Sequence, residues 1–156
     1  MVRNSKPSIF VSFSTKDMVV CENLIKNLNS PHYNFWYQKE INVGQEYKEI
    51  IKQNINSSVA SILLLSNNFL TSEFINSQEL PWIYQKDEKS IIYEVFPIQI
   101  EKCNWENIEY LKHKQIFPSR STSLNLDTKD HTATISEQIL NYFRNAGYIE
   151  KKGWFR

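Results

Sequence analysis

A single carboxylate, that of Glu79, is the group in this sequence best placed to do chemistry. It follows a short run, Ala60 to Leu65, in which five of six residues are apolar. This run is too short to span a membrane and lacks the spacing of an amphipathic helix, so it predicts a strand buried on both faces. Ser66, Asn67 and Asn68 end that strand.

The helix that carries Glu79 is predicted to begin at Ser72, a favourable N-cap residue. Glu73 follows where the positive end of the helix dipole favours an acid, and Glu79 lies a little under two turns further on. Pro81 removes one backbone hydrogen bond, and its ring clashes with the carbonyl of Ser77. These features predict a kinked helix whose bend presents Glu79 near the carboxyl end of a central strand, where open parallel sheets bind ligands.

Predicted strands and helices alternate along the chain. Runs of β-branched and aromatic residues predict strands, and apolar residues at helical spacing predict helices. Before Glu79 the strands are Ser8 to Phe13, Tyr33 to Tyr37 and Ala60 to Leu65, and the helices are marked by Val20, Leu24, Ile25 and Leu28 and by Tyr47, Ile50, Ile51 and Ile55. After it we expect a solvated turn at Lys86 to Lys89, a strand within Ile91 to Ile100, a short helix at Glu106 to Leu111, a strand at Thr122 to Leu126 and a helix from Thr134 to Gly147.

Three positions limit these elements. Pro97 places the fourth strand at a sheet margin or restricts it to Phe96 to Ile100. Gly44, which ends the loop from Gln38, is a predicted site of positive backbone angle. Ser14, together with an acid three residues later, frames a cap for the first helix.

The alternation predicts an α/β fold, a doubly wound parallel sheet flanked by helices. We expect the flavodoxin-like order, five strands arranged 2-1-3-4-5, with a switch point between the first and third strands. A ligand crevice is expected there, built from Ser12 to Asp17, from Ser66 to Ser72 and from the helix face carrying Glu79. The 156 residues suit a single domain, 8–147, between a flexible N-terminus, 1–7, and a C-terminal tail, 148–156.

Composition excludes several classes of partner. The net charge of +1 favours neither nucleic acid nor an anionic membrane. The opening residues MVRNSKPS contain no apolar signal segment, and no later window is apolar enough for a membrane helix, so we expect a cytoplasmic protein. Cys21 and Cys103 are far apart in sequence and are interpreted as reduced thiols.

Several chemistries are excluded at the expected crevice. A phospho-accepting receiver domain needs an aspartate after its third strand, where this chain has Ser66. The turn after the first strand, FSTKD, lacks the glycines of a redox dinucleotide fold, and no GxSxG nucleophile elbow occurs. His32, His113 and His131 lack metal-ligand spacing, so no metal is expected. One carboxylate beside hydroxyls and aromatics remains.

On the residues alone, an ordinary surface acid on an amphipathic helix is the favoured interpretation of Glu79, because structural acids outnumber catalytic ones. Glu73, Glu40 and Glu46 are alternative acids. Glu73 is more simply a helix-start charge, and the other two suit a solvated loop or a first helical turn.

The segments IFVSFSTKD, FWYQKEINVG, SVASILLLSNNFLTSEFINSQELPW and VFPIQIEKCNW, in this order and spacing, resemble a bacterial Toll/interleukin receptor (TIR) domain. The resemblance covers Ser8 to about Phe143. It implies the flavodoxin-like sheet and, as in many members, cleavage of the nicotinamide–ribose bond of NAD+, which gives nicotinamide and ADP-ribose or a cyclic isomer. NAD+ is then a substrate, and no cofactor is expected.

The resemblance also implies roles for particular residues. Glu79 is the implied catalytic carboxylate, and the implied substrate-binding residues are Phe13, Ser14, Asp17, Trp36, Gly44, Ser66 and Phe74. On the residues alone, Trp36 and Phe74 also suit core aromatics, and Ser14 suits a helix cap. Two departures occur: the aromatic Phe74 lies five residues before the glutamate rather than the family's four, and Tyr37 stands where many members have an acid.

Three functions follow from the resemblance. The first is an NAD+ glycohydrolase or cyclase in bacterial anti-phage defence or cell-death signalling, switched on by self-association and working with a separately encoded sensor or effector. The second is a non-catalytic module that binds other TIR domains. The third is an enzyme that exchanges nicotinamide for another base.

Overall fold

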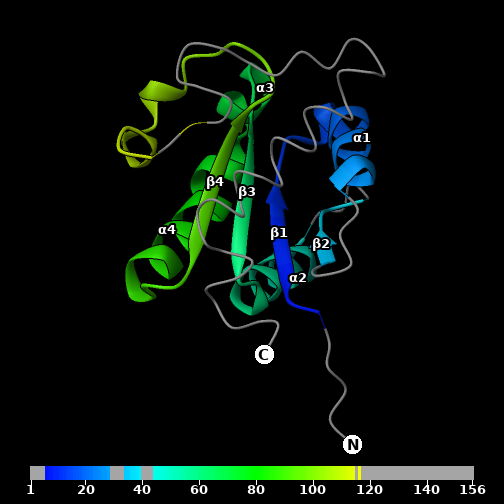
Figure 1. The fold of residues 1–156 in the computed structure, drawn as a ribbon, viewed down its shortest axis with the longest axis vertical. Helices are drawn as coiled ribbons and strands as arrows, with labels where there is room; N and C mark the ends of the chain where they lie inside the picture. The colour runs from blue at the N-terminus through cyan, green and yellow to red at the C-terminus, as the bar shows by residue number, and fades with distance from the viewer. Residues whose placement is uncertain (1–5, 29–33, 40–43, 115, 117–156) are drawn as a thin grey trace, which may run out of the picture.

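The computed structural model describes residues 6–28, 34–39, 44–114 and 116 of the chain. These residues form an α/β fold around a four-stranded parallel sheet in the order β2-β1-β3-β4 (Figure 1). The strands are β1 (Ser8–Ser12), β2 (Asn34–Trp36), β3 (Ala60–Leu65) and β4 (Glu94–Gln99). The fold class and the order of the first four strands are confirmed. The predicted fifth strand, Thr122 to Leu126, and the predicted final helix lie outside the described residues.

Helices cover both faces of this sheet (Figure 1). The described helices are η1 (Thr15–Asp17), α1 (Met18–Leu28), α2 (Gln45–Ser57), α3 (Asn67–Thr71), η2 (Ile75–Glu79), α4 (Leu80–Lys89), η3 (Trp105–Asn107) and η4 (Glu109–Leu111). Helix α1 packs on one face, against a cluster that includes Ile9 and Val11, and α2 and α4 pack on the other, against Phe10. Successive β1 side chains point to opposite faces, so one strand supplies both cores.

The central strand β3 has the predicted bounds, and all six of its residues are buried. Its neighbour β4 begins at Glu94 and contains Pro97, which is in register with Leu63. Among the described strands β4 pairs with β3 alone, so Pro97 lies at the margin of the described sheet. This is one of the two arrangements that the sequence predicted for a strand containing this proline.

Two local expectations are wrong, and one short helix was not expected. The segment Lys86 to Lys89 is not a turn but the last turn of α4. A short helix, α3, directly follows the strand-ending Ser66, whose hydroxyl accepts a hydrogen bond from the Phe69 N–H at 3.0 Å and so caps it. The predicted helix at Glu106 to Leu111 is two separate 3₁₀ turns, η3 and η4.

Within the described part of the chain, no helix is both long and apolar enough to cross a membrane.

Candidate active site

The Glu79 carboxylate is buried at the carboxyl end of β1. Its Oε1 accepts a hydrogen bond from the Ser12 hydroxyl at 2.9 Å. Ser12 is the last residue of β1 and is fully buried, and Glu79 is 6% exposed. The acid is thus near the carboxyl end of a central strand, the edge at which open parallel sheets bind ligands. A solvated surface acid would be largely exposed, so the interpretation of Glu79 as an ordinary surface acid is wrong.

Burial changes the acidity of this group. The protein interior disfavours the charged carboxylate and raises the pKa of Glu79 from 4.5 to about 7, although the Ser12 hydrogen bond opposes the shift. Near neutral pH the side chain therefore divides between its protonated and ionised forms. A carboxyl group with a pKa near neutral pH is suited to a catalytic role that depends on its protonation state.

The backbone beneath Glu79 is a π-helical turn, which the sequence did not predict. Residues Ile75–Glu79 form η2, and the N–H of Leu80 donates to the carbonyl of Ile75, five residues back. The predicted helix start is confirmed in that the Ser72 hydroxyl accepts a hydrogen bond from the Ile75 N–H at 3.3 Å. Pro81 is the second residue of α4, two positions after the last residue of the π turn.

The π turn also explains the unusual spacing between Phe74 and Glu79. In an α-helix residues four apart lie one turn apart, and in an i→i+5 turn residues five apart do. The Phe74 side chain packs against Tyr47, with ring centroids 5.3 Å apart, and against Trp82 at 6.3 Å. Trp36 stacks on Phe10 at 5.5 Å. Trp36 and Phe74 therefore lie on the sheet face that also contains Ser12 and Glu79.

Tyr47 is a neighbour of the acid that the sequence interpretation treated only as a helix marker. It lies in the first turn of α2, and its pKa is raised by burial and by the charge of Glu79. Gly44 is one of the predicted site residues, and Tyr47 lies three positions after it. That spacing alone could have included Tyr47 in the predicted site.

Phe13 is not brought to Glu79. Its ring packs on the α1 face of the sheet and meets Tyr37 edge-on, with centroids 6.1 Å apart. Because it follows Ser12 directly, the alternation of strand side chains sends it to the opposite face. Gly44 has a φ of 118°, as predicted, and stands at the N-cap of α2.

A second polar group joins the ends of β1 and β3. The Asp17 carboxylate accepts hydrogen bonds from the Ser66 hydroxyl at 2.6 Å and from the Asn68 side-chain amide at 3.0 Å. Ser14 accepts a bond from the Lys16 N–H at 3.3 Å and caps η1. The structure thus brings the predicted loop residues Asp17 and Ser66 together.

The alternative acids lie elsewhere. Glu73 and Glu46 are exposed, with Glu46 in the first turn of α2, and Glu40 lies outside the described residues. No cluster of metal-ligating side chains occurs among the residues that the structure describes. Both cysteines are free thiols, and burial raises the pKa of Cys103 to about 11.

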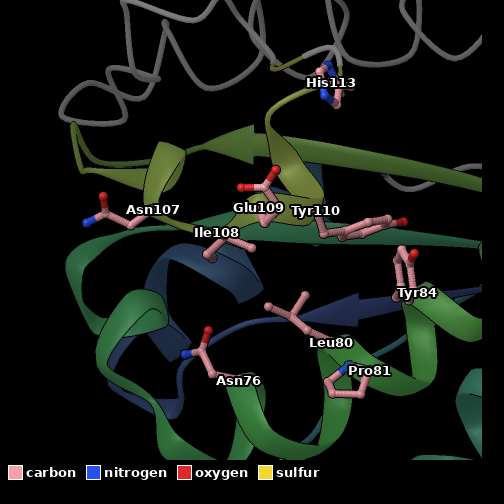
Figure 2. A pocket seen from close by; sticks show the side chains of 9 residues that line it. All are labelled: Asn76, Leu80, Pro81, Tyr84, Asn107, Ile108, Glu109, Tyr110 and His113. Carbon is pink, nitrogen blue, oxygen red and sulfur yellow. The ribbon is translucent and has the colours of Figure 1, made fainter.

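The two described pockets do not include Glu79. The larger, of about 660 Å³, lies between the helix that carries Glu79 and the η3–η4 segment, where Leu80 and Ile108 point toward each other (Figure 2). The smaller, of about 470 Å³, is lined by Asn67, Gln99 and residues 102–106.

The chain is similar to a protein family and to a curated protein. A family model described as TIR domain matches residues 9–140. An uncharacterised protein, y4lF, from Sinorhizobium fredii (strain NBRC 101917 / NGR234) is 24% identical over 110 residues, which make up 68% of this chain and 34% of that protein. The chain thus spans about a third of the length of the curated relative it matches.

Proposed function

Because the chain belongs to the TIR domain family, we propose that it cleaves the bond between nicotinamide and ribose in NAD+. Hydrolysis consumes one water and yields nicotinamide, ADP-ribose and a proton. Internal attack by the adenine would give a cyclic ADP-ribose isomer instead. We place this activity in bacterial anti-phage defence or cell-death signalling in the cytoplasm, with self-association and a separately encoded sensor or effector as its control.

The buried Glu79 carboxylate is the observation that carries the proposal. Loss of nicotinamide leaves positive charge on the ribose, and an ionised carboxylate stabilises such a charge as it develops. Burial strengthens this interaction because the low local dielectric screens it little. Nicotinamide leaves as a neutral base, so the reaction needs no general acid, and one carboxylate suffices.

The state of the carboxylate supports the same chemistry. With a pKa raised to about 7, Glu79 is partly protonated in the free protein near neutral pH. The nicotinamide ring of NAD+ is cationic, and a positive charge nearby favours the ionised form of a carboxyl group. Substrate binding would therefore charge the group that the transition state needs.

Aromatic side chains on the same face supply candidate walls for the substrate. Trp36 and Phe74 lie on the Glu79 side of the sheet, and Tyr47, in the first turn of α2, packs against Phe74. Flat aromatic rings pack well against a planar heterocycle such as nicotinamide. Asp17 and Ser66, joined at the ends of β1 and β3, are proposed to border the ribose.

The test compares three proteins at high concentration. Wild type, Glu79→Gln and Glu73→Gln are incubated with NAD+, and the products are identified by mass spectrometry. The Glu79→Gln amide keeps the size of the side chain and an oxygen that can accept from Ser12, whereas Glu73 is an exposed acid close by on the same segment. We expect at least a hundredfold loss for Glu79→Gln and wild-type turnover for Glu73→Gln.

Two results would overturn the proposal: no nicotinamide release by concentrated wild type, or equal release by wild type and Glu79→Gln. The product spectrum also separates hydrolysis from cyclisation and from base exchange, which would appear as a new dinucleotide when a free base is added. Turnover per molecule should rise with protein concentration if self-association activates the enzyme.

A non-catalytic interaction module is the second candidate. The burial of Glu79, which is 6% exposed, favours it. A buried acid held by Ser12 could serve the fold alone. This candidate predicts self-association or binding to other TIR domains, measured by light scattering, without NAD+ turnover at any concentration.

A further inference from the structure

The helix that carries Glu79 contains one residue more than a regular α-helical ladder can hold. The residues on either side of the π turn, Phe74 and Leu80, have ordinary right-handed helical backbone angles. The surplus residue is therefore confined to Ile75–Glu79, where the Leu80 N–H reaches back five residues to the carbonyl of Ile75. A surplus residue of this kind could in principle be placed at other points along a helix.

Where the surplus residue lies decides which way Glu79 faces. Ile75, Glu79 and Ile83 are all buried toward the sheet. If the surplus residue lay beyond Glu79, the segment from Phe74 to Glu79 would be α-helical, and Glu79 would turn by about 100° relative to Phe74, one residue's rotation in a helix of 3.6 residues per turn. The carboxylate would then leave Ser12.

The beginning of the π turn is fastened to α3. The Asn76 side-chain amide donates to the carbonyls of Phe69 at 3.2 Å, Leu70 at 3.1 Å and Ser72 at 2.7 Å. Two of these carbonyls belong to the last turn of α3, where a helix leaves its carbonyls without intrahelical partners. The Ser72 hydroxyl holds the Ile75 N–H. The Phe74 end of the turn is therefore fixed in orientation.

The end of the π turn is set by Pro81. In an α-helix the proline ring would clash with the carbonyl four residues back, which is that of Ser77. Ser77 lies inside the π turn, where the wider i→i+5 geometry relieves the crowding between that carbonyl and the ring. Proline also lacks an N–H, so residue 81 cannot donate the α-helical hydrogen bond to the carbonyl of Ser77 that would otherwise follow the π turn.

We propose that Pro81 is a positioning residue that confines the surplus residue to Ile75–Glu79 and thereby keeps the Glu79 carboxylate on Ser12. The effect on turnover rests on the proposed NAD+ cleavage. The effect on the position of Glu79 does not.

The experiment uses four proteins: wild type, Pro81→Ala, a deletion of Ser77, and the deletion combined with Pro81→Ala. Ser77 is an exposed residue of the π turn, and its deletion removes the surplus residue. The pKa of Glu79 is followed by carbon NMR of labelled glutamate carboxyls, with Glu79→Gln identifying the signal. NAD+ turnover is measured in parallel.

We expect Pro81→Ala to return the pKa of Glu79 toward the ordinary glutamate range and to lower kcat at least tenfold with KM changed less. The deletion alone restores an α-helical turn in which the Pro81 ring meets the carbonyl four residues back, so it should lower stability. In the deletion background Pro81→Ala should remove that clash and leave the pKa of Glu79 raised, because no surplus residue remains to move. This rescue separates positioning from a general loss of stability.

The proposal is overturned if Pro81→Ala keeps the wild-type pKa, or if it is as harmful with the deletion as without it. Should the deletion variant fail to fold, the pKa of Glu79 in Pro81→Ala decides alone. If wild type consumes no NAD+, the proposed function fails, while the NMR comparison still tests the role of Pro81.

Discussion

The hydroxyl of Ser12 and the carboxylate of Glu79 are 67 positions apart in the sequence and 2.9 Å apart in the fold. Both side chains are buried, so this hydrogen bond joins β1 to the π turn η2 inside the protein. Ser12 lowers the pKa of Glu79 while burial raises it more, and the pair therefore sets the pH at which the acid ionises.

Ser12→Ala should move the pH dependence of activity upward. A hydrogen bond to a charged group is worth about 1.5 kcal/mol or more, so its loss lowers the ratio of ionised to protonated carboxyl about tenfold. Starting from a pKa of about 7, the ionised fraction at pH 7 falls about fivefold. We expect kcat/KM, which reports the free enzyme, to fall by about that factor at pH 7 and to recover by about pH 9. Rate profiles from pH 5 to pH 9 measure the shift.

Ser58→Ala is the matched control for this prediction. Ser58 is also a buried serine, but its hydroxyl bonds to Tyr93 and to the carbonyl of Ile55, away from Glu79. It should lower stability without moving the rate profile. Equal shifts in the two variants would show that Ser12 has no particular effect on the acid.

Glu79→Gln should make the protein more stable at high pH. Below pH 4.5 the carboxyl is protonated in both the folded and the unfolded chain, so it imposes no penalty. As pH rises from 4.5 to about 7 the unfolded chain ionises first, and stability falls, by about 3 kcal/mol in total for a shift of this size. Urea unfolding at pH 5 and pH 8 should show a smaller loss in Glu79→Gln than in wild type. A parallel decline in both proteins would contradict this prediction.

The sequence was sufficient to predict the described strands, because the residue patterns that mark a strand are local. The run Ala60 to Leu65 is short, apolar and bounded by polar residues, and β3 has these bounds. The opposed directions of Ser12 and Phe13 also follow from strand alternation, so the sequence itself implies that Phe13 and Glu79 lie on different faces of the sheet once Ser12 faces the acid.

The π turn could not be predicted in the same way. Its residues, INSQE, carry no signal that distinguishes i→i+5 from α-helical hydrogen bonds. The turn depends on Asn76 binding carbonyls as far as seven residues back and on Pro81 following it, a combination of contacts that local propensity does not describe. The burial of Glu79 depends on the same contacts.

Lys86 to Lys89 shows a different limit of sequence interpretation. A run of charged residues suggests a solvated turn, but Lys86 places its ammonium group over the Tyr93 ring, 4.9 Å from the centroid. Long charged side chains can cover apolar surface while the charge finds partners at the edge. The charge run therefore completes α4.

Gly44→Ala should destabilise the fold. The φ of 118° and ψ of 179° at this position belong to a region that is essentially restricted to glycine, and occupying it costs another residue about 1–3 kcal/mol. No atom lies within 4 Å of an added Cβ, so the cost is backbone strain and not collision. Urea unfolding should show the loss, and Gln53→Ala, on the exposed side of α2, should not.

Lys86→Met should lower stability by roughly 2 kcal/mol, because the ammonium group caps the C-terminal end of α2. Its Nζ donates to the carbonyls of Ile55 at 2.9 Å and Ser58 at 2.6 Å, and also to that of Asn56. Methionine keeps the apolar length of the side chain but leaves these carbonyls without their donor. Lys89→Met, an exposed substitution in the same helical turn, is the control. Equal unfolding free energies for the two variants would show that the contacts of Lys86 contribute no net stability.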